Sequence, residues 1–257
     1  MLLVLSPAKS LDESPLRREV ATTTPKFMAQ AAELVELLRA QSAQDIASLM
    51  SISDKLAGLN VARFQAWRKQ PKPTPKPAVL TFNGDVYDGL NAATLDDEAL
   101  AWAQSHVCIL SGLYGVLRPL DALQPYRLEM GTRLPNPKGN HLYAFWGGDI
   151  TAYLNQRLRD SATPVLVNLA SEEYFKSVQP KALSGRLVHC AFEDEKAGKY
   201  KVISFFAKRA RGLMARWIID HRIENPQDLV RFDVDGYRWD EAASSPDRLV
   251  FRRPEAV

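Results

Sequence analysis

The residues with the clearest potential for chemistry lie in the stretch 111–121, which reads Ser-Gly-Leu-Tyr-Gly-Val-Leu-Arg-Pro-Leu-Asp and follows a short apolar run. The apolar run is typical of a buried strand, and two closely spaced glycines favour a tight turn or a close backbone approach. Polar groups at the carboxyl end of a strand are typical of ligand sites in α/β proteins. We therefore expect Ser111, Tyr114 and Arg118 to line such a site. The alternative is a structural turn in which Arg118 pairs with Asp121.

The same arrangement, a buried strand followed by a polar loop, occurs at four places in the chain. Apolar runs typical of strands lie near residues 3, 80, 109 and 167, and helical patterns separate most of them. This alternation predicts an α/β fold, a single mixed-sheet domain of residues 1–257 with surrounding helices. If the strands are parallel, their carboxyl ends share one edge of the sheet. The residues expected there are Lys9, Asp85, Ser111, Tyr114, Arg118, Glu172, Tyr174 and Lys176, with Lys208 and Arg209 beside them.

This predicted cleft combines acids, phenols and cations, which suits an enzyme acting on a nucleobase, a nucleotide or another small anion. Pairing of its acids with its bases is the structural alternative. The chain has no Walker loop, no G-x-S-x-G elbow and no G-x-G-x-x-G fingerprint, so no catalytic motif narrows the reaction. Its histidines are scattered without the spacing of metal ligands. We expect neither a cofactor nor a resident metal.

A second kind of candidate site lies in the helical region 43–68. Two helical patterns meet at Ser51-Ile52-Ser53, and their apolar spacing resembles a helix-hairpin-helix element, which offers backbone N–H groups to a DNA phosphate. Lys55 would add a positive charge at the start of the second helix. Serine stands where that element carries glycine, and an ordinary helical hairpin with Ser53 as the N-cap explains the same pattern.

Two basic segments extend the nucleic-acid hypothesis. Residues 69–77 alternate proline with basic or polar residues, which predicts an extended basic linker. A basic helix follows residue 207. Solvated surface charge is the alternative for both segments. The candidate nucleic-acid contacts are Ser51, Ser53, Lys55, Lys69, Lys72, Lys76, Lys208, Arg209 and Arg211.

Other patterns predict elements that would position these sites. Helical spacing covers residues 26–39, 96–106 and 142–159. Alternation predicts a strand over 125–131 and two antiparallel strands over 186–192 and 199–205. The dipeptide Asp235-Gly236 predicts a β-hairpin near the end of the chain.

Composition bounds the class of protein. The chain has 33 basic and 30 acidic residues, a net charge of +3 that does not by itself demand a polyanionic partner. Cys108 and Cys190 lie in apolar, strand-like runs and are predicted to be buried free thiols, which fits a reducing compartment. No apolar run approaches the roughly 20 residues that span a bilayer. We expect a cytoplasmic protein with no membrane partner.

Five segments together resemble one known family along the whole chain. They are 6–9 (SPAK), 53–58 (SDKLAG), 110–121 (LSGLYGVLRPLD), 168–171 (NLAS) and 207–212 (AKRARG), of which 110–121 is the most specific. Their order and sequence resemble the bacterial YaaA family of peroxide-stress proteins. The resemblance implies a cytoplasmic protein induced by hydrogen peroxide and associated with lower free intracellular iron. It also implies a helix-hairpin-helix-like element and binding of double-stranded DNA.

Two functional hypotheses follow. The first is a stress-response protein that contacts the phosphates of double-stranded DNA without strong sequence preference. The second is an enzyme that binds a small anionic ligand in the strand-end cleft. Direct sequestration of iron is a third, but the sequence offers no ligand cluster for it.

Overall fold

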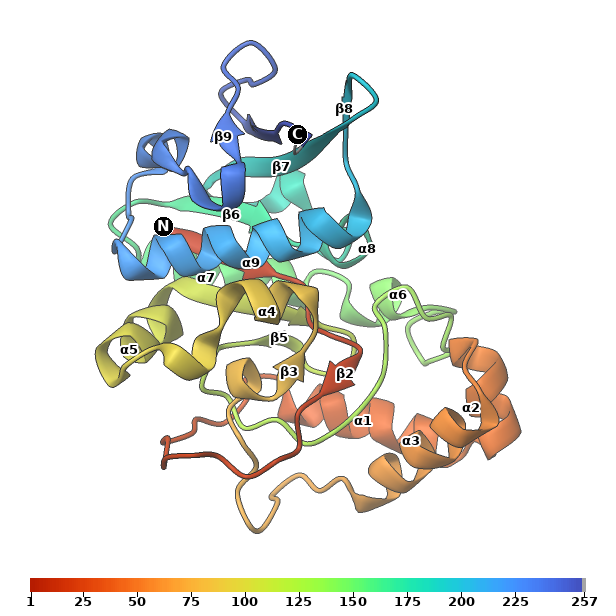
Figure 1. Ribbon diagram of the computed structural model, residues 1–257. Coiled ribbons are helices and arrows are strands. Elements are labelled where there is room, and N and C mark those ends of the chain that lie inside the picture. Colours follow the sequence, from red (N-terminus) through yellow and green to blue (C-terminus); the bar gives the residue numbers. More distant parts are fainter. Residues whose placement is uncertain (256–257) are drawn as a thin grey trace.

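The apolar runs near residues 3, 109 and 167 form neighbouring parallel strands at the centre of one mixed sheet (Figure 1). The computed structural model describes residues 1–255. The sheet has the order β5-β4-β1-β6-β7-β10-β9, and β8 pairs with β7 outside this path. The strands are β1 (Leu2–Leu5), β4 (Val107–Ser111), β5 (Gly115–Leu117), β6 (Val165–Leu169), β7 (Arg186–Lys196), β8 (Lys199–Lys201), β9 (Arg238–Trp239) and β10 (Arg248–Arg253).

Helices pack on both faces of this sheet. In Figure 1, α9 and α4 lie in front of the sheet and α7 lies behind it, while α2 and α3 project to one side as a helical hairpin. The helices are α1 (Met28–Arg39), α2 (Ala43–Met50), α3 (Asp54–Ala66), α4 (Asp85–Leu90), α5 (Asp97–His106), α6 (Leu142–Trp146), α7 (Asp149–Arg159), α8 (Glu172–Phe175) and α9 (Ser204–Asp220).

The central strands are buried along their whole length. Every residue of β1, β4 and β6 is buried, which explains why their sequences are almost wholly apolar rather than alternating, with Ser111 and Asn168 as the polar exceptions. Leu5 is in register with Ile109 of β4 and with Leu169 of β6, so the three strands end at the same edge. The α/β class and the parallel arrangement of these three strands are therefore confirmed.

The prediction of a fourth buried strand, near residue 80, is wrong. Ala78–Leu80 is a single 3-10 turn that follows Pro77, and local hydrogen bonds such as Thr81 N to Ala78 O hold it. The strand that follows it, β3 (Phe82–Asn83), pairs antiparallel with β2 (Ser10–Leu11) in a separate two-stranded sheet. A short apolar run next to a proline fits a buried turn as well as a strand, because both hide the same side chains.

Three further predictions need correction. Residues 125–131 form no strand; this segment runs over Gly112, where a Cβ would lie 2.2 Å from the carbonyl oxygen of Leu128. The helix expected over 142–159 is divided into α6 and α7 at Gly147, whose φ is +48°. Asp235-Gly236 lies in a 3-10 turn, and β9 pairs with β10 instead of forming a hairpin across it.

Other predicted elements are confirmed. Helices α1 and α5 fall within the expected ranges, and β7 pairs antiparallel with β8 across a short turn at Ala197-Gly198. The strand expected over 199–205 is shorter than predicted, because β8 ends at Lys201 and α9 begins at Ser204. Strand β7 continues to Lys196, beyond the predicted end, because its residues alternate between buried and half-buried positions over most of its length.

Helices α4 and α9 touch at the level of their backbones. A Cβ added at Gly212 would lie 1.8 Å from the carbonyl oxygen of Val86. A Cβ added at Gly89 would lie 2.3 Å from the carbonyl oxygen of Arg209. Each helix thus carries a glycine where the other crosses it. This contact fixes the basic first half of α9 over the start of α4, at the edge of the sheet where β1 and β6 end.

Both cysteines are buried free thiols, as predicted. Burial raises the pKa of Cys108 to about 11 and the pKa of Cys190 to about 12, since the charged thiolate loses hydration in the core. None of the helices within residues 1–255 combines the length and the apolar character that a bilayer-spanning segment requires.

Candidate functional site

Hydroxyl groups meet where the central parallel strands end. Ser6 follows β1, Ser171 follows β6, and the Oγ of Ser6 accepts a hydrogen bond from the backbone N–H of Ser171 at 2.8 Å. The phenol of Tyr87, on α4, donates to the carbonyl oxygen of Ser6 at 3.1 Å. Polar groups therefore meet at the carboxyl edge, although these three residues are not among those predicted to lie there. We call this group, together with Tyr126 and Tyr174, the strand-end cluster.

Tyr126 and Tyr174 complete the strand-end cluster from the loop after β5 and from α8. Burial is the main cause that raises the pKa of Tyr87, and the neighbouring Tyr126 and Tyr174 add to the effect. Burial likewise raises the pKa of Tyr174, with Tyr126 again the next contributor. These phenols are neutral over the physiological range, so they act as hydrogen-bond donors and acceptors rather than as anions.

The side chains of Ser111 and Tyr114 are bound to other residues inside the protein. Both are fully buried. The Oγ of Ser111 lies 2.6 Å from the hydroxyl of Tyr126 and accepts from the N–H of Tyr114 at 3.0 Å. The hydroxyl of Tyr114 accepts a hydrogen bond from Nε1 of Trp67 at 2.9 Å, which ties the end of α3 to the sheet. Both residues therefore contact Tyr126 of the strand-end cluster, Ser111 by its hydroxyl and Tyr114 edge-on, with 5.4 Å between the ring centres.

Arg118 pairs with Asp121, which was the alternative interpretation of this turn. The backbone N–H of Arg118 donates to Asp121 Oδ2 at 2.8 Å, and its Nη2 lies 3.1 Å from Oδ1. Thr23 donates to the same carboxylate at 2.5 Å. Desolvation raises the pKa of the buried Asp121, against these hydrogen bonds, which lower it. The pair anchors the turn of residues 118–121.

Two lysines of the predicted cleft form ion pairs, and a third lies over an aromatic ring. Lys9 Nζ is 3.1 Å from Glu129, and Lys208 Nζ is 3.9 Å from Asp85 at the start of α4. The ammonium group of Lys176 lies 5.1 Å from the centre of the Tyr143 ring. Lys9 and Lys208 remain more than half exposed, so these pairs are weak and can exchange partners.

Arg211 differs from these cations, because its Nε is buried and has no hydrogen-bond partner within residues 1–255. Burial lowers the pKa of Arg211, while Glu172 and Cys190 act in the opposite direction. Glu172 begins α8, directly after the Ser171 of the strand-end cluster, and is exposed. Arg211, which was predicted as a DNA contact, lies near Glu172 at this edge of the sheet.

Several residues at this edge were not predicted as site residues. Ser6 and Ser171 directly follow buried strands, as the predicted site residues do. Selecting polar residues that follow a predicted strand, which identified Lys9, could therefore have identified them as well. Tyr87 lies in the same polar stretch as the predicted Asp85 and carried the same signal, whereas Glu129 gave none because it lies in a segment predicted as a strand.

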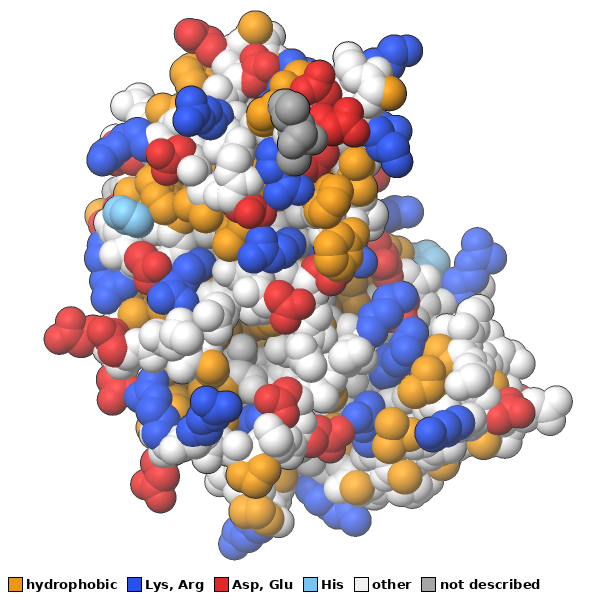
Figure 2. Space-filling model, viewed as in Figure 1, with side chains coloured by type: hydrophobic (Ala, Val, Ile, Leu, Met, Phe, Trp, Pro, Cys, Tyr) orange, Lys and Arg blue, Asp and Glu red, His pale blue; other side chains and the backbone are white. Residues whose placement is uncertain are grey.

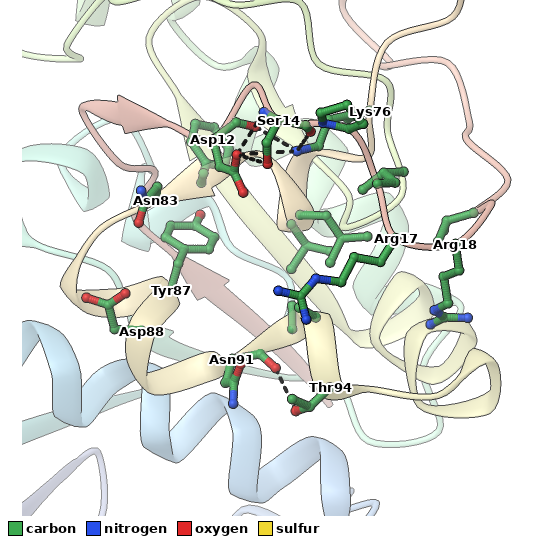
Figure 3. Close-up of a pocket in the computed structure, with 18 residues that line it drawn as sticks. Asp12, Ser14, Arg17, Arg18, Lys76, Asn83, Tyr87, Asp88, Asn91 and Thr94 are labelled. Atoms are coloured by element: carbon green, nitrogen blue, oxygen red, sulfur yellow. Dashed lines mark hydrogen bonds and ion pairs between the residues drawn. The ribbon is translucent and has the colours of Figure 1, made fainter.

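A pocket of about 640 Å³ lies on the other side of Tyr87 (Figure 3). Its walls come from the loop 12–20, from Lys76 and from residues 79–94. Figure 3 shows the guanidinium group of Arg17 pointing into the pocket. Lys76 donates to the carbonyl oxygens of Asp12 and Ser14 at 2.7 and 2.8 Å, so this predicted DNA contact holds the pocket wall.

The helical hairpin consists of α2 and α3, joined by Ser51-Ile52-Ser53. Ser51 has a φ of +51°, the left-handed conformation that glycine adopts most readily. Ser53 is the N-cap of α3, and its Oγ accepts from the N–H of Leu56 at 3.4 Å. Serine is therefore compatible with this turn, although its side chain adds bulk where a glycine would leave the backbone open.

The predicted nucleic-acid contacts are not equally available. Lys55, Lys69 and Lys72 are exposed and form no ion pair with another residue of the described chain. Arg209 is bound to Asp235 at 2.9 Å. In Figure 2 acidic and basic side chains are interspersed over the visible face. Among residues 1–255 no group of three or more His, Cys, Asp or Glu side chains is arranged to hold a metal ion.

The parallel strand core with a polar cluster at its carboxyl edge defines an α/β protein whose ligand site is expected at that edge. Residues 1–243 match the family described as peroxide stress protein YaaA, and the chain belongs to this family. It is 59% identical to a UPF0246 protein of Albidiferax ferrireducens over 258 residues, with 100% of both chains covered. UPF0246 proteins of Leptothrix cholodnii and Bordetella pertussis are 60% and 57% identical, again with 100% of both chains covered. The family resemblance seen in the sequence is confirmed.

Proposed function

We propose that this member of the peroxide-stress family is a cytoplasmic protein that binds double-stranded DNA through its phosphates and so limits oxidative damage. The observation that carries the proposal is the set of exposed lysines without acidic partners, Lys55, Lys69 and Lys72, at and beyond the two ends of α3. A helix of 13 residues is about 20 Å long, a length that spans several phosphates of a duplex. Unpaired lysines can neutralise phosphates without first breaking an ion pair.

The contact would carry little sequence information. Lysine acts as a point charge and recognises phosphate rather than base edges. The turn at Ser51-Ile52-Ser53 lies beside Lys55 and could approach the DNA backbone. Lys76, Lys208 and Arg209 contribute less, because they already bind Asp12, Asp85 and Asp235. We therefore expect binding without strong sequence preference and with a modest number of phosphate contacts.

Salt dependence of duplex binding tests this proposal. Each neutralised phosphate contributes about −0.9 to the slope of log K against log salt, so the three lysines predict a slope of about −3. Fluorescence anisotropy with a duplex of random sequence measures it. The triple variant Lys55→Ala, Lys69→Ala, Lys72→Ala should bind more weakly and show a slope near zero.

A matched variant controls for net charge. Arg159, Lys181 and Arg238 are exposed and lie outside the helical hairpin, so replacing all three with alanine removes the same charge and should leave duplex binding unchanged. Absence of duplex binding by the wild-type protein at low salt would sink the proposal. Equal losses in both triple variants would show that only net charge matters.

Lowering of free intracellular iron is the second part of the proposed role and is supported by family membership alone. The cellular test compares chelatable iron in peroxide-treated cells with and without this protein, and unchanged iron would contradict it. An anaerobic Fe(II) titration of the purified protein separates direct sequestration from an indirect route.

A second candidate function is an enzyme that acts on a nucleobase, a nucleotide or another small anion at the strand-end cluster. Arg211 favours it, because a buried guanidinium nitrogen without a partner leaves a binding position for an anionic ligand. The separate pocket on the other side of Tyr87 has a volume within the range of small-molecule sites, but Arg211 does not line it. Thermal-shift screening with nucleosides, nucleotides and inorganic phosphate tests it. A shift that Arg211→Met removes would support this function, and no shift with any of them would contradict it.

A further inference from the structure

Large hydrophobic side chains are exposed together where β8 meets α9. Tyr200 is 38% exposed, Val202 54%, Phe205 58% and Phe206 39%. Figure 2 shows hydrophobic side chains on the surface between β8 and the start of α9. Exposed apolar side chains are ordinary when single, but a contiguous group of this kind marks an interaction surface. We call these four residues the stacking surface.

Two arginines hold the aromatic rings of the stacking surface in place. The guanidinium carbon of Arg252 lies 4.7 Å from the centre of the Tyr200 ring, and that of Arg253 lies 4.7 Å from the Phe206 ring. Phe205 meets Phe206 edge-on, with 5.7 Å between ring centres.

These arginines are themselves fixed by carboxylates. Arg252 binds Glu193 at 3.0 Å and Asp240 at 2.7 Å, and Arg253 binds Asp194 at 2.7 Å. The rings of Tyr200 and Phe206 are therefore ordered before any partner arrives, which reduces the entropy lost on binding.

Two lysines beside the stacking surface have no acidic partner. Lys208 and Arg209 are paired with Asp85 and Asp235, whereas Lys199 and Lys201 form no ion pair with another residue of the described chain. Lys199 and Lys201 are exposed beside Tyr200. Ordered aromatic rings interleaved with cations match an unpaired nucleic-acid strand, whose bases stack on the rings while its phosphates meet the cations. A second copy of the chain would instead bring two basic segments against each other.

We propose that the stacking surface binds an unpaired segment of DNA. A duplex hides the faces of its bases, so this surface and the helical hairpin recognise different parts of a DNA molecule that contains both paired and unpaired regions. The inference deepens the proposed DNA-binding function and rests on it for the identity of the partner.

Binding of a fluorescently labelled oligothymidine, measured by anisotropy, tests the inference. Phe205→Ala should weaken binding roughly 5- to 100-fold, the loss expected when one base stack is removed. The variant should unfold at the wild-type temperature, because Phe205 is exposed. Leu59→Ala is the matched control: this side chain is 45% exposed on α3, away from the stacking surface, and its loss should leave oligothymidine binding unchanged.

The outcomes separate this inference from the proposed function. Loss of oligothymidine binding in Phe205→Ala with duplex binding retained, and the reverse in the Lys55, Lys69, Lys72 triple variant, would support both. Oligothymidine binding without any duplex binding would overturn the proposed function alone. Unchanged oligothymidine binding in Phe205→Ala overturns the inference. So does a concentration-dependent dimer, seen by sedimentation, that Phe205→Ala abolishes without affecting oligothymidine.

Discussion

Arg211 is the residue whose environment contrasts most with that of its neighbours on α9. Arg216 binds Asp220 at 2.8 Å and Thr94 at 2.5 Å, whereas Nε of Arg211 is buried without a partner. Replacing a guanidinium group whose Nε is buried and unpaired with an apolar side chain removes the desolvation penalty of that atom. We expect Arg211→Met to raise the free energy of unfolding by about 1 kcal/mol in urea at neutral pH.

Arg216→Met is the control for this measurement and should lower the free energy of unfolding, since it breaks formed interactions. A loss of several kcal/mol in Arg211→Met would contradict the environment described above.

Tyr114 contrasts with Arg211, because its buried hydroxyl group has a hydrogen-bond partner. Tyr114→Phe would leave the indole N–H of Trp67 buried and unpaired, so we expect the free energy of unfolding to fall by about 1–3 kcal/mol. Urea denaturation measures the loss. Tyr143→Phe removes a hydroxyl that donates to the carbonyl of Glu173 near the surface, and it should lower stability less. Equal effects would show that burial of the hydroxyl does not set the loss.

At the level of single residues the sequence predicted where polar groups gather but not which way they face. The turn of residues 111–121 was expected to present Ser111, Tyr114 and Arg118 to a ligand, yet two of them are buried and the third pairs with Asp121. Side-chain direction in an irregular turn depends on the segment that packs over it, here residues 125–131. The local sequence of residues 125–131 does not indicate where this segment packs.

Among the elements, the crossing of α4 and α9 is the most sensitive to a single methyl group. Gly212→Ala would place a Cβ 1.8 Å from Val86 O, so the two helices must separate, and we expect a loss of more than about 3 kcal/mol. Gly58→Ala offers the control: it lies within α3 with nothing within 4 Å of the added Cβ, and it should stabilise by about 0.5–1 kcal/mol. Thermal unfolding compares the two, and a neutral Gly212→Ala would refute the close contact.

Elements with a strong period or a continuous apolar run were predictable. The runs that became β1, β4 and β6 were identified because strands buried on both faces are apolar throughout. Ala78–Leu80 shares that composition, and only its partner in space distinguishes a turn from a strand. The break at Gly147 and the pairing of β9 with β10 likewise depend on tertiary packing, which local propensity does not contain.

For the whole molecule, the titrating groups predict a stability maximum near neutral to mildly alkaline pH. Burial lowers the pKa of His106 and of His189 from 6.5, so as the pH falls through 6.5 the unfolded chain takes up protons first and stability decreases. Burial raises the pKa of Cys108 and Cys190 from 9.0. Above pH 9 the unfolded chain therefore loses protons first, and stability decreases again.

Urea unfolding at pH 5.5, 8 and 10 measures this profile. The double variant His106→Gln, His189→Gln should flatten the acidic side only, and Cys108→Ala with Cys190→Ala should reduce the slope on the alkaline side. Greater stability at pH 5.5 than at pH 8 would contradict the assignment of the histidines.

The burial of both cysteine thiols has a consequence for a member of a peroxide-stress family. Hydrogen peroxide oxidises the thiolate form of cysteine, and thiols with a pKa of about 11 and about 12 are almost wholly protonated inside a cell. Neither cysteine is therefore built to become a sulfenic acid or to close a regulatory disulfide while the protein stays folded. This protein can therefore be present throughout an oxidative challenge without its own cysteines being consumed.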